Sequence, residues 1–493
     1  MSSVVLRSVV VGCFLVGGAA GSASAQQRPQ QVSFEEALRA VEPGAAGLVA
    51  ARAKIVGAQH QVDAAKSAYY PQLTGSVGYS LTLASEFDNF NLGGLVPNYG
   101  ALLCPITDDA GNVFCEQRYQ DIYNPPVPEG SDDSGSALPF GQRNTWRLGV
   151  NASQQIYDFG RTKAGVRSAS VAVELAKLSE QQIRATAVYA ASSAYFGAAL
   201  AQRSVEISEQ SLASAEDTLA DAQLKEKNGA IAEFDVVRAE VARDTERNAL
   251  VRSQSKRDQA FRSLKRLLLI PLDRPIELTT KLRLDAASGD DADDALGKAL
   301  AAAGLTANSK RISLIQAELA VTASEQASAL AAADRWPTIT AVSDFGLVNY
   351  QKQPFNGDWA NNWTVGVNVS IPIFDGFRRR ALLRKADADL AAARASVVDG
   401  ARAIELDAAQ ADDTIAAALQ IWQASARTVA LAQRAYEIAE LRFSQGSSTQ
   451  LELVDARLQL NRSQLSQASS EHDLRVARLR RALLPGLAVG PAF

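Results

Sequence analysis

Four segments of the chain alternate apolar and polar residues with a period of two, the pattern of a β-strand with one apolar face. We expect these strands at 72–83, 145–157, 338–348 and 362–373. Each is about as long as a β-strand that crosses a lipid bilayer. The clearest alternation places these apolar side chains on one face: Trp363, Val365, Val367, Val369, Ile371 and Ile373. The second strand does the same with Trp146, Leu148, Val150, Ala152 and Ile156.

Long helical patterns follow the second and the fourth strand. Residues 161–268 and 377–483 each predict a helical hairpin, interrupted at Gly229 in the first and at Gly446 in the second. The first arm of each hairpin would be about 100 Å long as a continuous helix. Apolar residues spaced seven apart on these arms favour coiled-coil pairing, and the amphipathic helix of a globular bundle is the alternative. Shorter helices are expected over 34–68 and 292–334.

The two hairpins belong to an internal repeat with an offset of 217 residues. The segment from Ile156 to Arg161 recurs from Ile373 to Arg378, and Gly229 recurs as Gly446. An apolar stretch that ends at Ala23-Ser24-Ala25 is typical of a secretory signal peptide. We therefore expect a signal peptide at 1–25, a first repeat at 26–271, an equatorial linker at 272–291, a second repeat at 292–485 and a C-terminal tail at 486–493.

Composition narrows the class of protein. The net charge of −4 argues against a nucleic-acid partner, which requires a basic surface. After residue 26 no apolar run is long enough for a membrane-spanning helix. In an exported chain Cys104 and Cys115 are expected to form a local disulfide, with two free thiols as the alternative. The two histidines, His60 and His472, lack the spacing of metal ligands, so we expect no metal, no cofactor and no enzyme.

The apolar strand faces favour a membrane sheet over a surface sheet packed on a soluble core. Four strands cannot close a barrel, and open sheet edges are not tolerated in lipid. Membrane insertion therefore requires oligomerisation, and three protomers supply twelve strands, enough to enclose a lumen. Trp146 and Trp363, which occupy equivalent positions in the repeat, are then expected at the membrane interface.

The order of strand pair, long helix and glycine-broken hairpin, repeated once, resembles the TolC-type outer-membrane efflux and secretion channels, also called outer membrane factors. The most specific likeness lies in the two strand-to-helix junctions and in the hairpin motifs that run from Gly229 to Ala239 and from Gly446 to Ala456. The resemblance implies a mainly α fold with membrane β-structure. A homotrimer would form a twelve-stranded β-barrel with four strands per protomer, continued by a periplasmic α-helical barrel. It also implies residence in the outer membrane of a Gram-negative bacterium, with extension into the periplasm.

The same resemblance implies the exit channel of a tripartite export system. Such a channel serves type I protein secretion, efflux of small toxic compounds, or both. Its partners would be a periplasmic adaptor, docked at the hairpin tips around Gly229 and Gly446, and an inner-membrane ABC or RND transporter. The alternative from a different class is a soluble periplasmic coiled-coil adaptor or scaffold.

The resemblance assigns roles to residues near the hairpin tips. Glu452 and Asp455 match two carboxylates that ring the periplasmic aperture, and Asp235 matches an acidic residue of the latch that closes it. Phe443 and Ser448 stand where the family has the tyrosine and the arginine of that latch, so the closed state must be held by other groups, such as Arg442, Arg238 or Lys227. Glu452 and Asp455 are three apart and share a helix face. Ordinary acidic residues in the first turn of a helix are the alternative interpretation.

Overall fold

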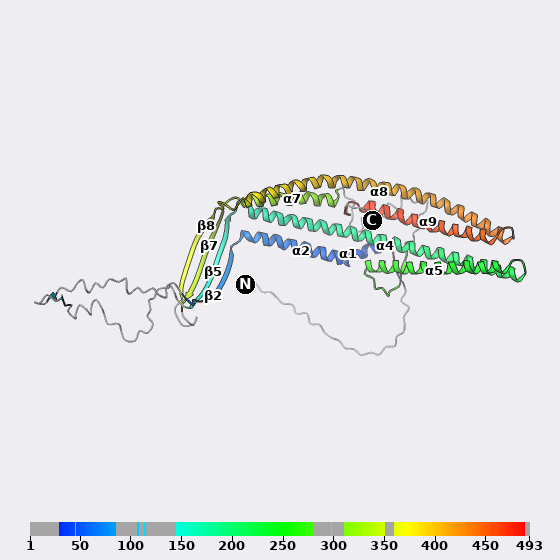
Figure 1. The fold of residues 1–493 in the computed structure, drawn as a ribbon, viewed down its shortest axis with the longest axis horizontal. Helices are drawn as coiled ribbons and strands as arrows, with labels where there is room; N and C mark the ends of the chain where they lie inside the picture. The colour runs from blue at the N-terminus through cyan, green and yellow to red at the C-terminus, as the bar shows by residue number, and fades with distance from the viewer. Residues whose placement is uncertain are drawn as a thin grey trace, which may run out of the picture. The chain divides into compact units, whose positions relative to one another are not determined.

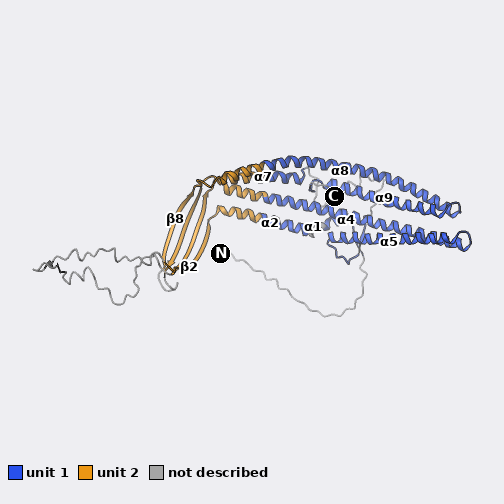
Figure 2. Cartoon of the chain, in the orientation of Figure 1, with its two compact units in different colours: residues 1–58, 172–321, 391–493 blue, residues 59–171, 322–390 orange. Residues whose placement is uncertain are grey.

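The computed structural model describes residues 29–44, 46–84, 106–107, 113–114, 144–280, 297, 310–350 and 359–488. These residues form two compact units, each of which draws on both repeats (Figure 2). The first unit comprises 1–58, 172–321 and 391–493, and the second comprises 59–171 and 322–390. The predicted signal peptide and both Cys104 and Cys115 lie outside the described residues, and so do residues 292–296 and 298–309 of the expected helix 292–334.

The second unit contains a four-stranded antiparallel sheet in the order β2-β5-β7-β8 (Figure 1). Its strands are β2 (Gln72–Leu81), β5 (Asn144–Tyr157), β7 (Thr338–Asn349) and β8 (Ala360–Ser370). β5 pairs with β7 and thereby joins the two repeats. The pairing leaves β2 and β8 as the two edge strands, each with one row of backbone groups that no strand of the sheet covers.

The register gathers the apolar residues of all four strands on one face of the sheet. Val77 pairs with Leu148, Leu148 with Leu347, and Phe345 with Trp363. Directly paired residues of an antiparallel sheet project to the same side, so these side chains form one continuous surface. It remains exposed in the protomer: Val77 is 78% exposed, Val365 74% and Trp363 71%. The opposite face carries mainly small and polar residues: Thr74, Ser76, Arg147, Asn151, Ser153, Thr364, Asn368 and Ser370.

Two strand ends differ from the predicted pattern. A β-bulge between Gln155 and Tyr157 shifts the pairing, so Tyr157 pairs with Ile339 and Ile156 becomes the extra residue. The bulge places Ile156 and Tyr157 together opposite Ile339, a shift that the simple alternation did not predict. β8 ends at Ser370 rather than at residue 373, because Pro372 has no backbone N–H to donate to a ladder.

The helical repeat has the same dimensions in both halves. α4 (Arg161–Lys227) and α8 (Arg378–Ser444) each contain 67 residues and are offset by 217 positions. The returning helices are α5 (Glu233–Leu267) and α9 (Gln450–Leu483), whose first residues have the same offset. The predicted two-fold repeat of strands and helical hairpins is confirmed.

The structure describes the shorter helices in part. The segment expected as one helix over 34–68 consists of α1 (Phe34–Gly44), α2 (Ala46–Lys66) and the 3₁₀ turn η1 (Ser67–Tyr69). Residue 45, between α1 and α2, lies outside the described residues. Before the second strand pair, the structure has α7 (Ile312–Ala333). None of the helices in the described ranges has a stretch apolar enough to span a bilayer.

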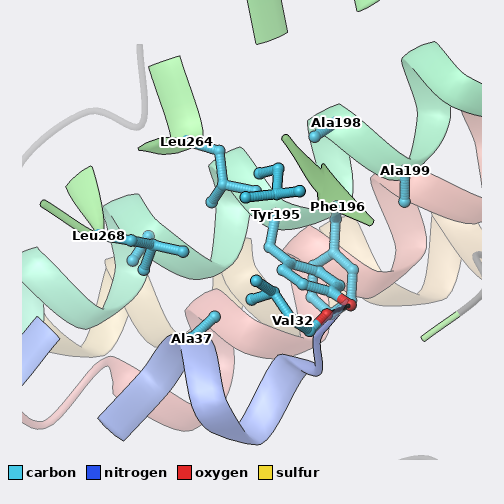
Figure 3. Packing of buried hydrophobic residues seen from close by; sticks show 10 residues of the cluster. Val32, Ala37, Tyr195, Phe196, Ala198, Ala199, Leu264 and Leu268 are labelled. Carbon is cyan, nitrogen blue, oxygen red and sulfur yellow. Dashed lines mark hydrogen bonds between the residues drawn. The ribbon is translucent and has the colours of Figure 1, made fainter. Parts of the chain in front are cut away.

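A small core of the first unit lies around a parallel two-stranded sheet that the sequence did not reveal. β1 (Gln30–Val32) pairs with β6 (Ile276–Leu278), which lies within the stretch predicted as a linker. Figure 3 shows Tyr195 and Phe196 of α4 packed beside Val32. The buried Tyr195 hydroxyl donates to Val32 O at 3.1 Å and accepts from the N–H of Thr280 at 3.2 Å. The Tyr195 side chain thus connects α4 to the segments that contain β1 and β6.

A buried ion cluster joins three segments of the first unit. Asp407 of α8 accepts from Nη2 of Arg311 at 2.5 Å and from Nη2 of Arg480, on α9, at 3.0 Å. The side chains of Arg311 and Asp407 are only 8% and 7% exposed. Since Arg311 immediately precedes α7, this carboxylate links α7, α8 and α9.

Candidate functional site

The two hairpin tips have the same backbone turn. α4 and α8 each end in a turn whose glycine has a left-handed conformation, with φ of 73° at Gly229 and 72° at Gly446. Ala230 N donates to Lys225 O at 2.8 Å, and Ser447 N donates to Arg442 O at 2.9 Å. These bonds satisfy carbonyl groups at the helix ends, which is the usual role of a glycine after a helix. The glycines therefore set where each long helix turns back.

Acidic residues open both returning helices. Glu233 and Asp235 lie in the first turn of α5, and Glu452 lies in the first turn of α9. Thr449 caps α9, since its hydroxyl accepts from the N–H of Glu452 at 3.4 Å. A helix N-terminus favours negative charge, which accounts for part of this acidity without any role in transport.

Glu452 and Asp455 both face solvent in the protomer. Glu452 Oε2 accepts from Ser448 Oγ at 2.6 Å and lies 3.8 Å from Nη1 of Arg442. The Ser448 hydroxyl therefore orients the neighbouring carboxylate. The carboxylates of Glu452 and Asp455 remain available to a surface outside the single chain, and their role as an aperture ring stays a prediction.

Phe443 contacts a lysine. Nζ of Lys225 lies 4.5 Å from the centroid of the Phe443 ring and donates to Phe443 O at 3.4 Å. The same ammonium forms an ion pair with Asp221 at 2.8 Å. An ammonium over an aromatic face is attracted by the ring quadrupole, so this contact holds α4 against α8 without a tyrosine hydroxyl.

Asp235 is half-buried, and its backbone takes part in a second contact between the hairpins. With its amide oriented to satisfy both atoms, the buried Gln450 side chain donates to Asp235 O at 3.0 Å and accepts from the N–H of Ala239 at 3.2 Å. The two hairpins of one chain are thus joined near their tips by Lys225–Phe443 and by Gln450 with α5.

The sequence did not indicate that Lys225 and Gln450 connect the two hairpins. The residues predicted to hold the closed state were Arg442, Arg238 and Lys227. Arg442 contacts Glu452, while Arg238 lies over the ring of Phe234. The internal repeat could have pointed to Lys225, because this residue lies at the position equivalent to Arg442, 217 residues earlier. No comparable pattern pointed to Gln450.

The predicted interface tryptophans share the apolar face but lie at different levels of the sheet. Trp146 pairs with Asn349, whereas Trp363 pairs with Phe345, four residues earlier on β7. Trp146 packs on Tyr79 with ring centroids 4.5 Å apart, and Trp363 Nε1 donates to Ser343 Oγ at 3.0 Å. The two tryptophans occupy equivalent positions in the repeat, but they lie at different heights along the strands of the sheet.

An aspartate accepts hydrogen bonds from backbone N–H groups where β5 leads into α4 and where β8 leads into α8. Asp158 accepts from the N–H groups of Gly160 and Thr162 at 3.1 and 2.7 Å. Asp375 accepts from the N–H of Arg379 at 3.0 Å and pairs with its guanidinium at 2.8 Å. Partial burial raises the pKa of Asp158, but hydrogen bonds from Thr162 and Gly160 and the charge of Arg161 outweigh it, so the pKa is lowered. The carboxylate therefore caps α4 in its charged form.

Both junctions place two consecutive residues in the left-handed region. The pair is Phe159 and Gly160 in the first repeat, and Gly376 and Phe377 in the second. The order of glycine and phenylalanine is thus reversed. Phe159 stacks on Trp336 at 5.1 Å, and Phe377 meets Phe374 edge-on at 5.6 Å.

Metal chemistry has no visible basis in the part of the chain that the structure describes. There, no three His, Cys, Asp or Glu side chains come close enough together to bind an ion. The features that stand out are instead an exposed apolar sheet face and two acidic hairpin tips.

The chain is similar in sequence and in fold to known outer-membrane proteins. Residues 130–268 and 306–483 match the family model described as outer membrane efflux protein. A curated relative, the outer membrane protein TolC of Vibrio cholerae, is 25% identical over 182 residues, which cover 36% of this chain and 42% of that protein. The matched stretch thus spans less than half of the relative's length.

Two solved structures illustrate the shared fold. The CmeC outer membrane channel of Campylobacter jejuni has a TM-score of 0.69 at 13% identity, with 97% of this chain and 95% of CmeC covered. The outer membrane protein VceC of Vibrio cholerae has a TM-score of 0.68 at 17% identity, with 91% and 95% covered. Because the family model matches most of the sequence, the chain belongs to the outer membrane efflux protein family, and it is an outer-membrane protein that extends into the periplasm.

Proposed function

We propose that the chain is one third of a homotrimeric exit duct that spans the outer membrane and continues into the periplasm. The observation that carries this proposal is the four-stranded sheet with one exposed apolar face and two unpaired edges. Lipid is a suitable environment for that face, and pairing of β2 with the β8 of a neighbour removes both edges. Three copies give twelve strands and a polar lumen formed by the opposite face.

The duct is passive in this proposal, and its energy comes from the inner membrane. The hairpin tips around Gly229 and Gly446 are the docking surface for a periplasmic adaptor, which connects the duct to an ABC or RND transporter. The cargo is a secreted protein, small toxic compounds, or both. The exposed valines of β8 disfavour the alternative, a soluble periplasmic scaffold, which would have to leave this apolar surface in water.

The purified protein tests the duct directly. We expect it to resist carbonate extraction from outer membranes, to run as a trimer in detergent, and to form conducting channels in planar bilayers. Release into the soluble fraction as a monomer without channel activity would refute the duct and support the scaffold.

Within this duct, Glu452 and Asp455 form a cation-selective ring at the periplasmic aperture. Threefold symmetry brings six carboxylates around one axis, where they concentrate cations. We expect the double substitution Glu452→Ala/Asp455→Ala to weaken block by divalent cations by about tenfold or more, because that attraction is lost. Single-channel recordings with increasing Mg²⁺ measure the effect.

A matched control removes two exposed acidic residues far from the tip. The variant Glu405→Ala/Asp413→Ala loses the same charge from the middle of α8 and is expected to keep the original block. Equal block in the aperture variant and the parent protein would contradict the ring, while a conducting trimer would still support the duct.

A further inference from the structure

Basic residues gather where the sheet of the second unit meets its helices. We call them the junction collar: Lys66, Arg161, Lys163, Arg167, Arg335, Arg378, Arg379, Arg380, Arg384 and Lys385. The strand-to-helix segments 66–72, 156–167, 333–338 and 371–385 contain these ten cations and only three acidic residues. The chain as a whole has a net charge of −4, so this surplus of seven positive charges is local.

The three acidic residues of these segments are already engaged. Asp158 and Asp375 cap the two long helices, as described above. Asp334 forms an ion pair with Arg161 at 2.9 Å. They cannot neutralise the remaining cations of the collar.

Lys385 forms an ion pair with Asp389, just beyond these segments, at 2.6 Å. Seven collar residues are exposed and lack a carboxylate within ion-pair distance anywhere in the described ranges of the chain: Lys66, Lys163, Arg167, Arg335, Arg378, Arg380 and Arg384. Unneutralised guanidinium groups on one surface repel one another unless an anion lies between them. A planar guanidinium also matches the oxygens of a phosphate group in a bidentate arrangement. The collar therefore has the chemistry of a phosphate-binding surface.

Exposed aromatic side chains lie at the same junctions: Tyr69, Tyr70, Tyr157, Trp336, Phe374 and Phe377. Phe374 is 75% exposed and Tyr70 68%. Along β8 and into α8 the sequence thus passes from exposed valines, through aromatic residues, to arginines. This order matches the acyl chains, the interface and the headgroups of a lipid leaflet.

We propose that the junction collar binds the headgroup phosphates of anionic phospholipids in the leaflet that faces the periplasm. The proposal rests on the membrane position of the sheet that was proposed above. Each cation near an anionic membrane surface strengthens attraction on the order of fivefold at low salt. A collar with several free cations per protomer selects anionic lipid over zwitterionic lipid.

Tryptophan fluorescence in nanodiscs tests this selectivity. One reporter of the full-length protein keeps only Trp336 and a second keeps only Trp363, with the other tryptophans changed to Phe. Brominated phosphatidylglycerol and brominated phosphatidylcholine then serve as quenchers. We expect phosphatidylglycerol to quench Trp336 several-fold more effectively, and we expect this preference to fall as NaCl screens the charges. Trp363, near the end of β8 that is remote from the collar, is expected to show no such preference.

The charge dependence is tested by substitution. The variant Arg378→Gln/Arg380→Gln/Arg384→Gln is expected to lose most of the preference at Trp336. The control Arg402→Gln/Arg427→Gln/Arg434→Gln removes the same charge from exposed positions further along α8 and is expected to retain it.

Three outcomes overturn the collar. They are equal quenching of Trp336 by both lipids, a preference that survives the collar variant, and a preference that phosphate removes but chloride of equal ionic strength does not. The last outcome would indicate a site for free phosphate. Absence of quenching of Trp363 by either lipid would instead refute the membrane position of the sheet, so the two failures are distinguishable.

Discussion

Val367→Arg is expected to prevent stable insertion of the protein into the outer membrane. Val367 lies on the apolar face of β8 and is 64% exposed in the protomer. Arginine at the centre of a bilayer costs about 2–4 kcal/mol per site. In a trimer that cost arises three times. We expect loss of the trimer band in unheated gels and of the protein in the washed outer-membrane fraction.

The adjacent residue provides the control. Asn368 is also exposed in the protomer but projects to the opposite face of the sheet. Asn368→Arg is expected to leave the trimer intact and to change only the conductance, since it places the charge in the lumen. Because both side chains are exposed in the single chain, only a lipid-facing surface predicts different outcomes. Equal tolerance of the two variants would exclude lipid contact at Val367.

Asp407→Asn is expected to cause the largest loss of stability in the helical part of the chain. Asp407 accepts hydrogen bonds from both Arg311 and Arg480 in a nearly solvent-free site. Removing one partner of a buried ion pair costs about 3–5 kcal/mol, since the other charge remains buried without compensation. Thermal unfolding followed by circular dichroism at 222 nm should show a clearly lower midpoint.

Asp412 supplies the matched comparison on the same helix. Its carboxylate accepts from Nε of Arg481 at 2.5 Å, but both side chains are about half exposed. Exposed pairs contribute up to about 1 kcal/mol, so Asp412→Asn should shift the midpoint only slightly. The triple variant Arg311→Met/Asp407→Leu/Arg480→Met, which leaves no unpaired charge of the cluster, should recover much of the stability lost in Asp407→Asn. Similar midpoints for the two single variants would show that the buried cluster does not stabilise the fold.

The repeated architecture was readable from the sequence because periodic signals accumulate over long elements. α4 and α8 have 67 residues each, and their glycine-terminated ends recur at a constant offset. Strand alternation likewise predicted the apolar face, since a side chain changes sides at every residue. These features depend on local patterns, which one sequence contains in full.

Features that depend on a single residue or on distant partners were missed. The bulge at Ile156 changes the register without interrupting the apolar run, and β1 and β6 are three-residue strands too short to alternate. Lys225 meets Phe443 across 218 positions of sequence, so no local pattern reveals the contact. The interaction of Asp407 with two arginines depends on helix packing in the same way.

The reversed order of Phe159–Gly160 and Gly376–Phe377 has a consequence for the symmetry of the proposed trimer. Each protomer contributes two bends of similar backbone geometry but with different aromatic neighbours. Around the circumference of the complete assembly, six bends alternate between two chemical types. The strand-to-helix transitions of that assembly would therefore have threefold and not sixfold chemical symmetry.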